Sequence, residues 1–242
     1  MDSSIYRHAD HGLAGCFFRN RRRNQTRTSG PFAEGTTGTV RAMAAMAQLR
    51  DRESMEHLIG GTTLYYSTTY SSPVGTITLG GDGENLAGLW IEGQKYFGDT
   101  APEDMSKKDD LPVFTAAKRW LDRYFTGKRP LISELPLRPA GGEFRQRVWK
   151  ILCEIPYGDV TTYGAIAGKI AKQTGKESMS SQAVGGAVGH NPISIIIPCH
   201  RVVGAGGSLT GYSAGIAVKV KLLAHESVDM SRLFVPKRGT AL

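Results

Sequence analysis

A cysteine and a histidine, Cys199 and His200, stand side by side in the segment NPISIIIPCHRVVG, directly after an apolar run and a proline. A free thiol has a pKa of about 8.5, so a reactive cysteine needs a nearby base or a positive field. His200 could be that base. Neighbouring side chains of an extended chain point to opposite faces, however, so a direct hydrogen bond between the two requires a turn or a bridging water. The pair therefore predicts a nucleophilic thiol that is not part of an ordinary cysteine-protease dyad.

A carboxylate further along the chain could complete this site. The segment KVKLLAHES has helical character, with apolar residues at Val220, Leu222 and Leu223, and Glu226 follows near its end. A carboxylate there could orient the histidine and stabilise its charged form. Taken by itself, however, Glu226 is more typical of an exposed residue at a helix end, and the residue pattern leaves both interpretations open.

Three helices are predicted ahead of the cysteine. The first lies in EFRQRVWKILCEIP and ends at Pro156; the second begins at Thr161 or Thr162, as N-cap, and ends near Gly175. The third lies in SMSSQAVGGAVGHNP, starts at a serine and ends between Gly189 and Pro192. The apolar residues that recur at helical spacing in the first are Phe144, Val148, Ile151 and Leu152.

The second and third helices, with basic Lys169, Lys172 and Lys176 nearby, are compatible with a helix-turn-helix, although helical hairpins are common and leave DNA binding open. The third is unusual because most of its residues are small. Its two glycines, Gly185 and Gly186, cost an α-helix about 2 kcal/mol relative to alanine. Either this helix brings its backbone close to something large, or it packs tightly inside its own domain.

A separate unit precedes these helices. From Leu64 onward, short runs rich in Thr, Ile and Tyr are interrupted by Ser-Pro and Gly-Asp-Gly, which predicts a small antiparallel sheet. LPVFTAAKRWLDRYFTGKRP then predicts a helix that stops at Gly127 and Pro130, and a Pro- and Gly-containing link follows from Leu135 to Gly142. The apolar face of that helix, expected in the core, consists of Phe114, Ala117, Trp120, Leu121 and Tyr124.

Residues 1–61 have a different composition and are predicted to be a disordered extension. The run RNRRRNQTR, from Arg19 to Arg27, could contact phosphates, could be a solvated tail, or could lie upstream of a later start such as Met55; it also faintly resembles a transit peptide.

The whole chain has 242 residues, a formal charge of +8 and three cysteines. No stretch approaches the roughly 18 to 20 apolar residues that span a bilayer, so an intracellular, cytoplasmic protein with free thiols is expected. The positive charge favours a polyanionic partner. Cys153 is expected to be a small buried hydrophobe, and no CxxC or HxxxH spacing suggests a metal site.

The segment PCHRVVG, preceded by AVGGAVGHNPISIII and followed by LTGYSAGIAVKVKLLAHE, resembles the active-site region of the O6-alkylguanine-DNA alkyltransferases, also called methylated-DNA–protein-cysteine methyltransferases. The resemblance is specific from about Phe144 to Glu226 and weaker back to Leu64. It implies an α/β plus mostly α fold class: a small ribonuclease-H-like αβ N-terminal domain, residues 62–138, followed by a helical, winged helix-turn-helix DNA-binding domain, residues 139–242.

The resemblance also implies a reaction. The protein would bind double-stranded DNA, flip out a guanine that carries an O6-alkyl group, and transfer the group irreversibly to its own cysteine, once per molecule. O4-alkylthymine would be a second substrate. The protein would act as a monomer, without a cofactor, a metal or a membrane.

Roles at matching positions follow from the same resemblance. Cys199 would take the alkyl group, activated through a water held by His200, which Glu226 orients. Asn191 would tie the recognition helix to the cysteine loop, and the Tyr163 hydroxyl would protonate the leaving guanine at N3.

The pocket and the DNA contacts are implied in the same way. Tyr212 would form a wall, Ser213 would supply a backbone donor to O6, the Val202 carbonyl would accept from the exocyclic amine, and Lys219 would support the pocket. Residues expected to contact DNA are Ser181, Gln182, Ala183 and Gly185.

Two positions depart from the family pattern. Gln182 stands where most members have an arginine that fills the space left by the flipped base, so altered DNA affinity or salt dependence is expected. His190 replaces the usual small or basic residue, and the sequence gives no prediction for the effect of this change.

Other classes of function compete with this interpretation. An alkyltransferase-like lesion sensor shares the pocket but lacks the cysteine that this chain has. A winged-helix regulator would explain the basic helices but not the Cys-His-Glu set, and a cysteine hydrolase would show multiple turnovers on an ester or amide.

Overall fold

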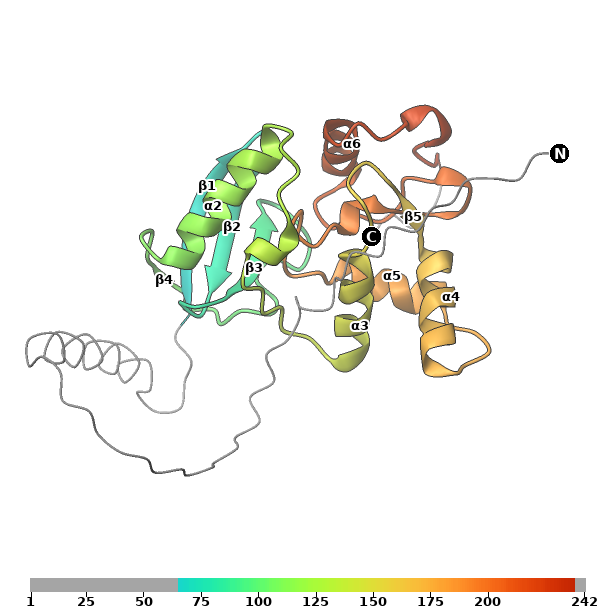
Figure 1. The fold of residues 1–242 in the computed structure, drawn as a ribbon, viewed down its shortest axis with the longest axis horizontal. Helices are drawn as coiled ribbons and strands as arrows, with labels where there is room; N and C mark the ends of the chain where they lie inside the picture. Colours follow the sequence, from blue (N-terminus) through green and yellow to red (C-terminus); the bar gives the residue numbers. More distant parts are fainter. Residues whose placement is uncertain (1–64, 238–242) are drawn as a thin grey trace, which may run out of the picture.

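The first half of the described chain forms a four-stranded sheet covered by one long helix (Figure 1). The structure, a computed structural model, describes residues 65–237. Strands β1 (Tyr66–Ser72), β2 (Gly75–Gly81) and β3 (Leu86–Ile91) form an antiparallel meander. A two-residue strand, β4 (Ser106–Lys107), lies on the other side of β1, giving the order β3-β2-β1-β4.

The prediction of a purely antiparallel sheet is wrong at this edge. Strand β4 runs parallel to β1, because the chain leaves β3, crosses to the far edge and enters beside Tyr65 in the direction of β1. Two residues carry no detectable alternation, so no sequence pattern could have identified this strand.

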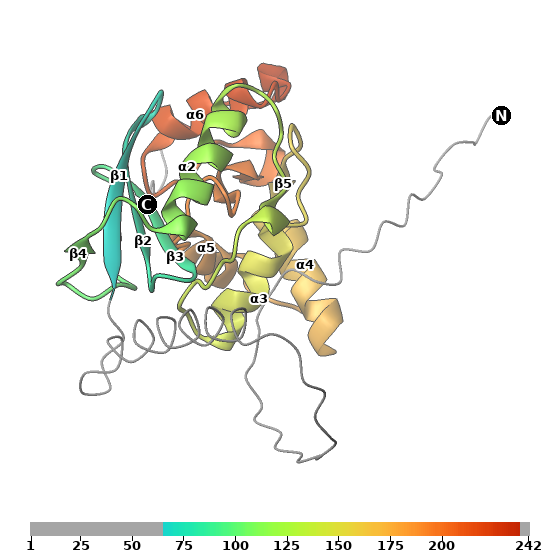
Figure 2. The ribbon, with the colours of Figure 1, turned by 60° about the vertical axis from the view of Figure 1, so that its left-hand side comes forward.

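Helix α2 (Pro112–Phe125) lies along the sheet, and the same arrangement is visible from a second direction (Figure 2). Pro112 occupies its first turn, where the missing amide hydrogen costs no helical bond. The chain leaves the helix through Thr126 and Gly127, whose φ of +76° suits glycine. The predicted helix and its apolar face are confirmed: the buried side chains are Val113, Phe114, Ala117, Trp120, Leu121 and Tyr124.

The second half is mainly helical. Its helices are α3 (Glu143–Leu152), α4 (Tyr163–Thr174), α5 (Ser181–Gly189) and α6 (Ile216–His225). The short strands β5 (Thr161–Thr162) and β6 (Val202–Val203) pair in parallel. Single turns of 3-10 helix are η1 (Ile132–Glu134), η2 (Cys199–Arg201), η3 (Ala205–Gly207) and η4 (Met230–Arg232).

The helix ends follow the predicted signals. Thr162 caps α4 by accepting a hydrogen bond from the Ala165 amide (3.0 Å), and Gly175 ends it with φ +66°. Ser180 caps α5 by accepting from the Ala183 amide (3.2 Å). Helix α5 packs against both α3 and α4, so these three helices form one cluster.

The two halves meet at strand β3. The Leu89 amide donates to the Pro192 carbonyl (2.8 Å), and the Ser194 amide donates to the Leu89 carbonyl (3.0 Å). The segment that leads to the cysteine therefore extends the first sheet. Buried side chains from both halves, such as Ile77, Trp149 and Ile197, belong to one continuous apolar core.

Parts of the sequence prediction fall outside the described residues. The extension 1–61, with its arginine run, and Cys16 are among them. Among the helices of residues 65–237, none has the length and apolar character needed to cross a membrane.

Candidate active site

The apolar run before the cysteine forms a tight, fully buried turn. The Ile197 amide donates back to the Ile193 carbonyl (3.0 Å), and Ile195 adopts φ +68°. A β-branched residue is rarely found in that conformation, which costs about 1–3 kcal/mol and persists only where the surroundings enforce it. The bonds to Leu89 of β3 supply this enforcement. The turn ends at Pro198 and delivers Cys199 into the single helical turn η2.

The Asn191 side chain holds this turn from inside. Its Oδ1 accepts from the Ile193 amide (3.1 Å), while its Nδ2 donates to the Ile197 carbonyl (2.8 Å) and contacts Cys199 Sγ (3.1 Å). Asn191 follows α5 directly, so one buried amide connects the end of that helix to the thiol.

The thiol is almost completely buried, with 3% of Cys199 exposed. Burial raises the pKa of the Cys199 thiol, and the Asn191 amide and the charge of Lys219 offset this only in part. The resting thiol is therefore protonated at neutral pH, and its reaction as a nucleophile requires a base that removes the proton.

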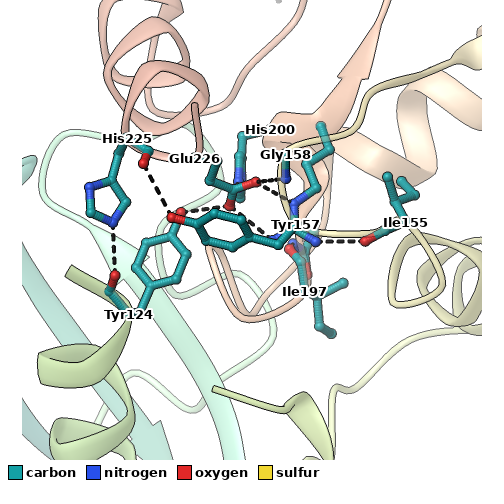
Figure 3. A network of polar contacts seen from close by, with 10 residues as sticks. Tyr124, Ile155, Tyr157, Gly158, Ile197, His200, His225 and Glu226 are labelled. Carbon is teal, nitrogen blue, oxygen red and sulfur yellow. Dashed lines mark hydrogen bonds and ion pairs between the residues drawn. The ribbon is translucent and has the colours of Figure 1, made fainter. Parts of the chain in front are cut away.

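The side chains of His200 and Glu226 lie next to each other in the interior (Figure 3). His200 Nε2 lies 2.8 Å from Glu226 Oε1, and both side chains are fully buried. The residue that the pattern left open as an exposed helix end is thus an interior carboxylate, 1% exposed, at the C-terminus of α6.

Arg201 completes the charge balance of this group. Its Nε donates to Glu226 Oε2 (2.7 Å), its Nη2 to Glu226 Oε1 (2.9 Å), and its Nη1 to the Ile155 carbonyl (2.6 Å). Burial alone would raise the pKa of the Glu226 carboxyl, but the hydrogen bonds from His200 and Arg201 outweigh it and hold that pKa well below its usual range. Glu226 is therefore a carboxylate at neutral pH.

The protonation of His200 follows from these neighbours. Burial lowers the pKa of the His200 imidazole, against the opposing effect of Glu226, so the ring is neutral at pH 7. Its single proton sits on Nε2, which faces the carboxylate, and this leaves a lone pair on Nδ1. Nδ1 is buried and has no hydrogen-bond partner among the described residues. An unpaired basic nitrogen on the residue that follows a protonated thiol could take the thiol proton directly or through a water.

A wall of polar groups surrounds the thiol. The Tyr163 hydroxyl donates to the carbonyls of Gly211 (3.0 Å) and Thr210 (3.2 Å), and burial raises its pKa, so it remains a hydrogen-bond donor. Lys219 Nζ donates to the carbonyls of Val202 (2.5 Å) and Thr210 (3.0 Å), and burial lowers its pKa to about 8.

Two further predicted pocket residues lie in the loop before α6. The Tyr212 hydroxyl is buried without a partner in the described chain, and burial raises its pKa well above the usual value. Ser213 is half-buried, and its carbonyl accepts from the Lys95 amide (2.8 Å).

The predicted DNA-contact residues lie on α5. Ser181, Gln182 and Ala183 are exposed in its first turn, and Gly185 is half-buried beside the Tyr163 ring. A Cβ added at Gly186 would meet nothing within 4 Å, so this side of the helix is open. The buried side is fixed by the Trp149 indole, which donates to the Ala187 carbonyl (2.8 Å).

The unusual residue after α5, His190, contacts the first half of the chain. Its ring stacks on Tyr96 with 3.9 Å between centroids, and its Nδ1 lies 2.7 Å from the Gly186 carbonyl. His190 is thus a packing residue at the junction.

The sequence prediction missed two residues that donate hydrogen bonds to Glu226 in the interior. Arg201 directly follows the Cys-His pair, and the need of an interior carboxylate for a cation could have pointed to it. Tyr124 was assigned only to the core, yet its hydroxyl donates to Glu226 Oε1 (2.8 Å). Cys153, expected to be buried, is half-buried at the end of α3.

Open space on the surface does not coincide with this chemistry. A groove of about 600 Å³ runs between the end of α3, the start of α4 and residues 228–233, and none of the predicted site residues lines it. Among the described residues, no cluster of His, Cys, Asp and Glu could hold a metal ion.

Comparison with known proteins matches both halves of the chain. Residues 64–139 match the family model described as 6-O-methylguanine DNA methyltransferase, ribonuclease-like domain, and residues 143–228 match 6-O-methylguanine DNA methyltransferase, DNA binding domain. A methylated-DNA–protein-cysteine methyltransferase of Haemophilus influenzae is 43% identical over 168 residues, which cover 69% of this chain and 88% of that protein. One from Methanosarcina acetivorans is 42% identical over 164 residues, covering 67% and 98%.

Solved structures agree. The crystal structure of Mycobacterium tuberculosis O6-methylguanine methyltransferase superposes with a TM-score of 0.58 at 40% identity, covering 72% of this chain and 97% of that one. A Mycobacterium tuberculosis OGT in complex with DNA gives 0.56 at 41% identity, covering 70% and 94%. With a ribonuclease-like domain followed by a DNA-binding domain that carries a buried cysteine, histidine and glutamate, the chain belongs to the methylated-DNA–protein-cysteine methyltransferase family.

Proposed function

We propose that the protein repairs O6-alkylguanine in double-stranded DNA by moving the alkyl group to Cys199 in a single turnover. The observation that carries the proposal is that buried Cys199 is followed in the chain by a buried His200, whose Nε2 is held by Glu226 and whose Nδ1 has no partner among the described residues. In the reaction, the bond from Cys199 Sγ to the alkyl carbon forms while the bond from that carbon to guanine O6 breaks, and the electron pair stays on guanine. The thioether product resists hydrolysis, so each molecule repairs one base.

The thiol proton moves to His200 Nδ1 through a bridging water. Because Nε2 keeps its proton and faces Glu226, the histidine becomes an imidazolium held next to a carboxylate. The negative charge of Glu226 stabilises that cation, and Arg201 keeps the carboxylate ionised and correctly placed.

The leaving guanine takes its proton from Tyr163, whose hydroxyl moves from the carbonyls of Thr210 and Gly211 to guanine N3. Burial raises the pKa of the Tyr163 hydroxyl, so it is still protonated and available as a hydrogen-bond donor when the guanine anion forms. The Val202 carbonyl accepts from the exocyclic amine, Ser213 donates from its backbone to O6, and Tyr212 closes the wall. Lys219 fixes that wall by holding two of its carbonyls.

Helices α4 and α5 form the helix-turn-helix of a winged helix-turn-helix domain, with α5 as the recognition helix. The minor groove is only about 6 Å wide, and a helix enters it only if its contact face is nearly bare. The exposed, small residues of α5 fit that requirement. Gln182 fills the space that the flipped base leaves, and exposed Lys172 and Lys176 contact phosphates.

The same pocket extends to O4-alkylthymine, which presents an alkyl group on an exocyclic oxygen in the same way. The protein acts as a monomer, because every group of the proposed site comes from one chain. A free thiol is essential to the reaction, so we place the protein in the reducing cytoplasm.

The test uses duplex DNA that carries radiolabelled O6-methylguanine. Incubation with excess DNA is expected to label the protein up to a plateau of one alkyl group per molecule, and peptide mass mapping is expected to place the label on Cys199. Label on Cys153 or Cys16, or continued turnover beyond one equivalent, contradicts the proposal.

Restoring the arginine that most relatives carry, with Gln182→Arg, is expected to speed repair of duplex DNA at limiting protein. A guanidinium adds charge and a stacking plane beside the vacated base position. The fall of affinity with salt should steepen by up to about one unit of logarithmic slope if a phosphate is contacted. Single-turnover rates and salt titrations measure both effects.

Free O6-benzylguanine is the internal control for this variant, since it needs no base flipping. Its transfer rate should be the same in Gln182→Arg and in the natural chain. An equal change in the transfer rate on both substrates would mean that Gln182 acts on the shape of the pocket. An unchanged rate on both would mean that Gln182 has no role in base flipping.

A further inference from the structure

A tyrosine from the ribonuclease-like domain reaches the reactive group of the other domain. Tyr124 lies near the end of α2 and is 1% exposed. Its hydroxyl donates to Glu226 Oε1 (2.8 Å), a residue 102 positions later in the chain, and Figure 3 shows the ring pointing at this carboxylate. The backbone carbonyl of Tyr124 accepts from His225 Nε2 (2.8 Å), so α2 and α6 are joined twice at this point.

The carboxylate that Tyr124 contacts is saturated with donors. Glu226 Oε1 is within 2.8–2.9 Å of Tyr124, His200 and Arg201. Its Oε2 accepts from Arg201 and, at 3.4 Å, from the Gly158 amide. A carboxylate offers about four lone-pair positions, so all the hydrogen-bonding positions of Glu226 are occupied. Each donor therefore fixes the carboxylate's orientation and takes a share of its charge.

We propose that Tyr124 is a positioning residue for alkyl transfer: its hydroxyl holds the Glu226 oxygen that orients His200 and shares the negative charge of that oxygen. The inference rests on the proposed function and adds a contribution from the ribonuclease-like domain to it. It assigns Tyr124 no contact with the substrate.

Two effects follow when the hydroxyl is removed. Glu226 becomes freer to rotate, so His200 is less well oriented and transfer slows. Oε1 also loses one of three donors, so more of its charge acts on His200, which raises the pKa of the imidazole. A neutral histidine is required to take the thiol proton, so the acid limb of the pH–rate profile moves to higher pH.

The other titratable or charged groups around the pair remain in place when only this hydroxyl is lost. They are Cys199, Arg201, Lys219, Tyr212, Tyr157 and Arg129. A shift of the profile is therefore attributable to the Tyr124 hydroxyl.

Packing by Tyr124 can be separated from its hydrogen bond. The ring stacks on Trp120 (5.5 Å between centroids, 9° between planes) and contacts the Tyr157 ring edge-on (6.1 Å). Phenylalanine preserves both contacts and removes only the oxygen, so Tyr124→Phe isolates the hydroxyl.

Tyr157→Phe is the matched control. That hydroxyl is in the same cluster of rings but donates to the His225 carbonyl (3.2 Å), not to Glu226. In the full chain, we expect Tyr124→Phe to react with free O6-benzylguanine about tenfold more slowly near neutral pH. Its acid limb should also shift to higher pH. Tyr157→Phe should retain the natural rate and profile at a temperature where both variants are folded.

A double-mutant cycle distinguishes an effect that passes through Glu226 from a general loss of folding or packing. If Tyr124 acts through the carboxylate, adding Tyr124→Phe to Glu226→Gln should change the rate far less than it changes the natural chain. A natural rate and profile in Tyr124→Phe overturns the inference, as does slowing that is fully additive with Glu226→Gln. Absence of label on Cys199 in the natural chain would instead refute the proposed function.

Discussion

Replacing Cys199 with alanine is expected to abolish alkyl transfer and to leave binding to duplex DNA unchanged. Alanine has no atom that can form the new bond to the alkyl carbon. The exposed residues at the start of α5 do not include the thiol, and Asn191 still holds the turn through the Ile193 amide and the Ile197 carbonyl. Radiolabel incorporation and fluorescence anisotropy with a duplex measure the two properties separately.

Cys153→Ser provides the control for this experiment. Cys153 is half-buried at the end of α3, outside the group around His200, and its replacement should leave both transfer and binding intact. Residual labelling of Cys199→Ala at the natural rate would show that another side chain is the acceptor.

Replacing Glu226 with glutamine is expected to slow transfer to free O6-benzylguanine by about 100-fold, within the range of general acid–base effects. The amide is neutral, so the imidazolium that forms on His200 loses its counter-charge. Arg201 also loses the partner of a buried ion pair, which should lower the free energy of unfolding by about 3–5 kcal/mol. Single-turnover kinetics and denaturant unfolding test the two effects.

The pH dependence of stability provides a second readout for this variant. The pKa of Glu226 is held below its unfolded value, so the carboxylate stabilises the fold above the unfolded pKa of about 4.3. That stabilisation is lost as the pH falls toward the folded pKa. Glu226→Gln should therefore show a weaker loss of stability between about pH 5 and pH 3 than the natural chain.

Glu154→Gln is the control for an ordinary ion pair. Glu154 and Lys169 form a largely exposed pair, and such pairs contribute about 0–1 kcal/mol. This variant should keep the natural transfer rate. A Glu226→Gln protein that matched it in rate and stability would remove Glu226 from the proposed mechanism.

Elements governed by local signals could be predicted from the sequence. The caps at Thr162 and Ser180, the left-handed Gly175 and the apolar face of α2 lie where the residue pattern indicates. Each depends on neighbours a few positions away, which a sequence window contains. The contact between His200 and Glu226 was expected from the resemblance to the alkyltransferases, because the residue pattern alone left Glu226 open as an exposed helix end.

Features that depend on distant packing could not be predicted. The bond from Tyr124 to Glu226 joins residues 102 positions apart, and an apolar helix face says nothing about where its hydroxyl points. The parallel edge strand at Ser106 has too few residues for any period, and the burial of Glu226 requires Arg201 from another element. These features depend on residues that are far apart in the sequence and meet only in the folded chain, which no local pattern encodes.

The hydrogen bonds between Leu89 and the buried turn that precedes Cys199 have a consequence for the nascent chain. Synthesis proceeds from the N-terminus, and domains generally fold in that order. Strand β3 is thus made long before its partners Pro192 and Ser194, and the carboxylate that orients His200 follows 26 residues after the histidine. A polypeptide that has been made only as far as His200 already contains strand β3 and the turn, but it lacks the counter-charge of Glu226. Translation order therefore delays the reactivity of Cys199 until both domains have been made and have joined.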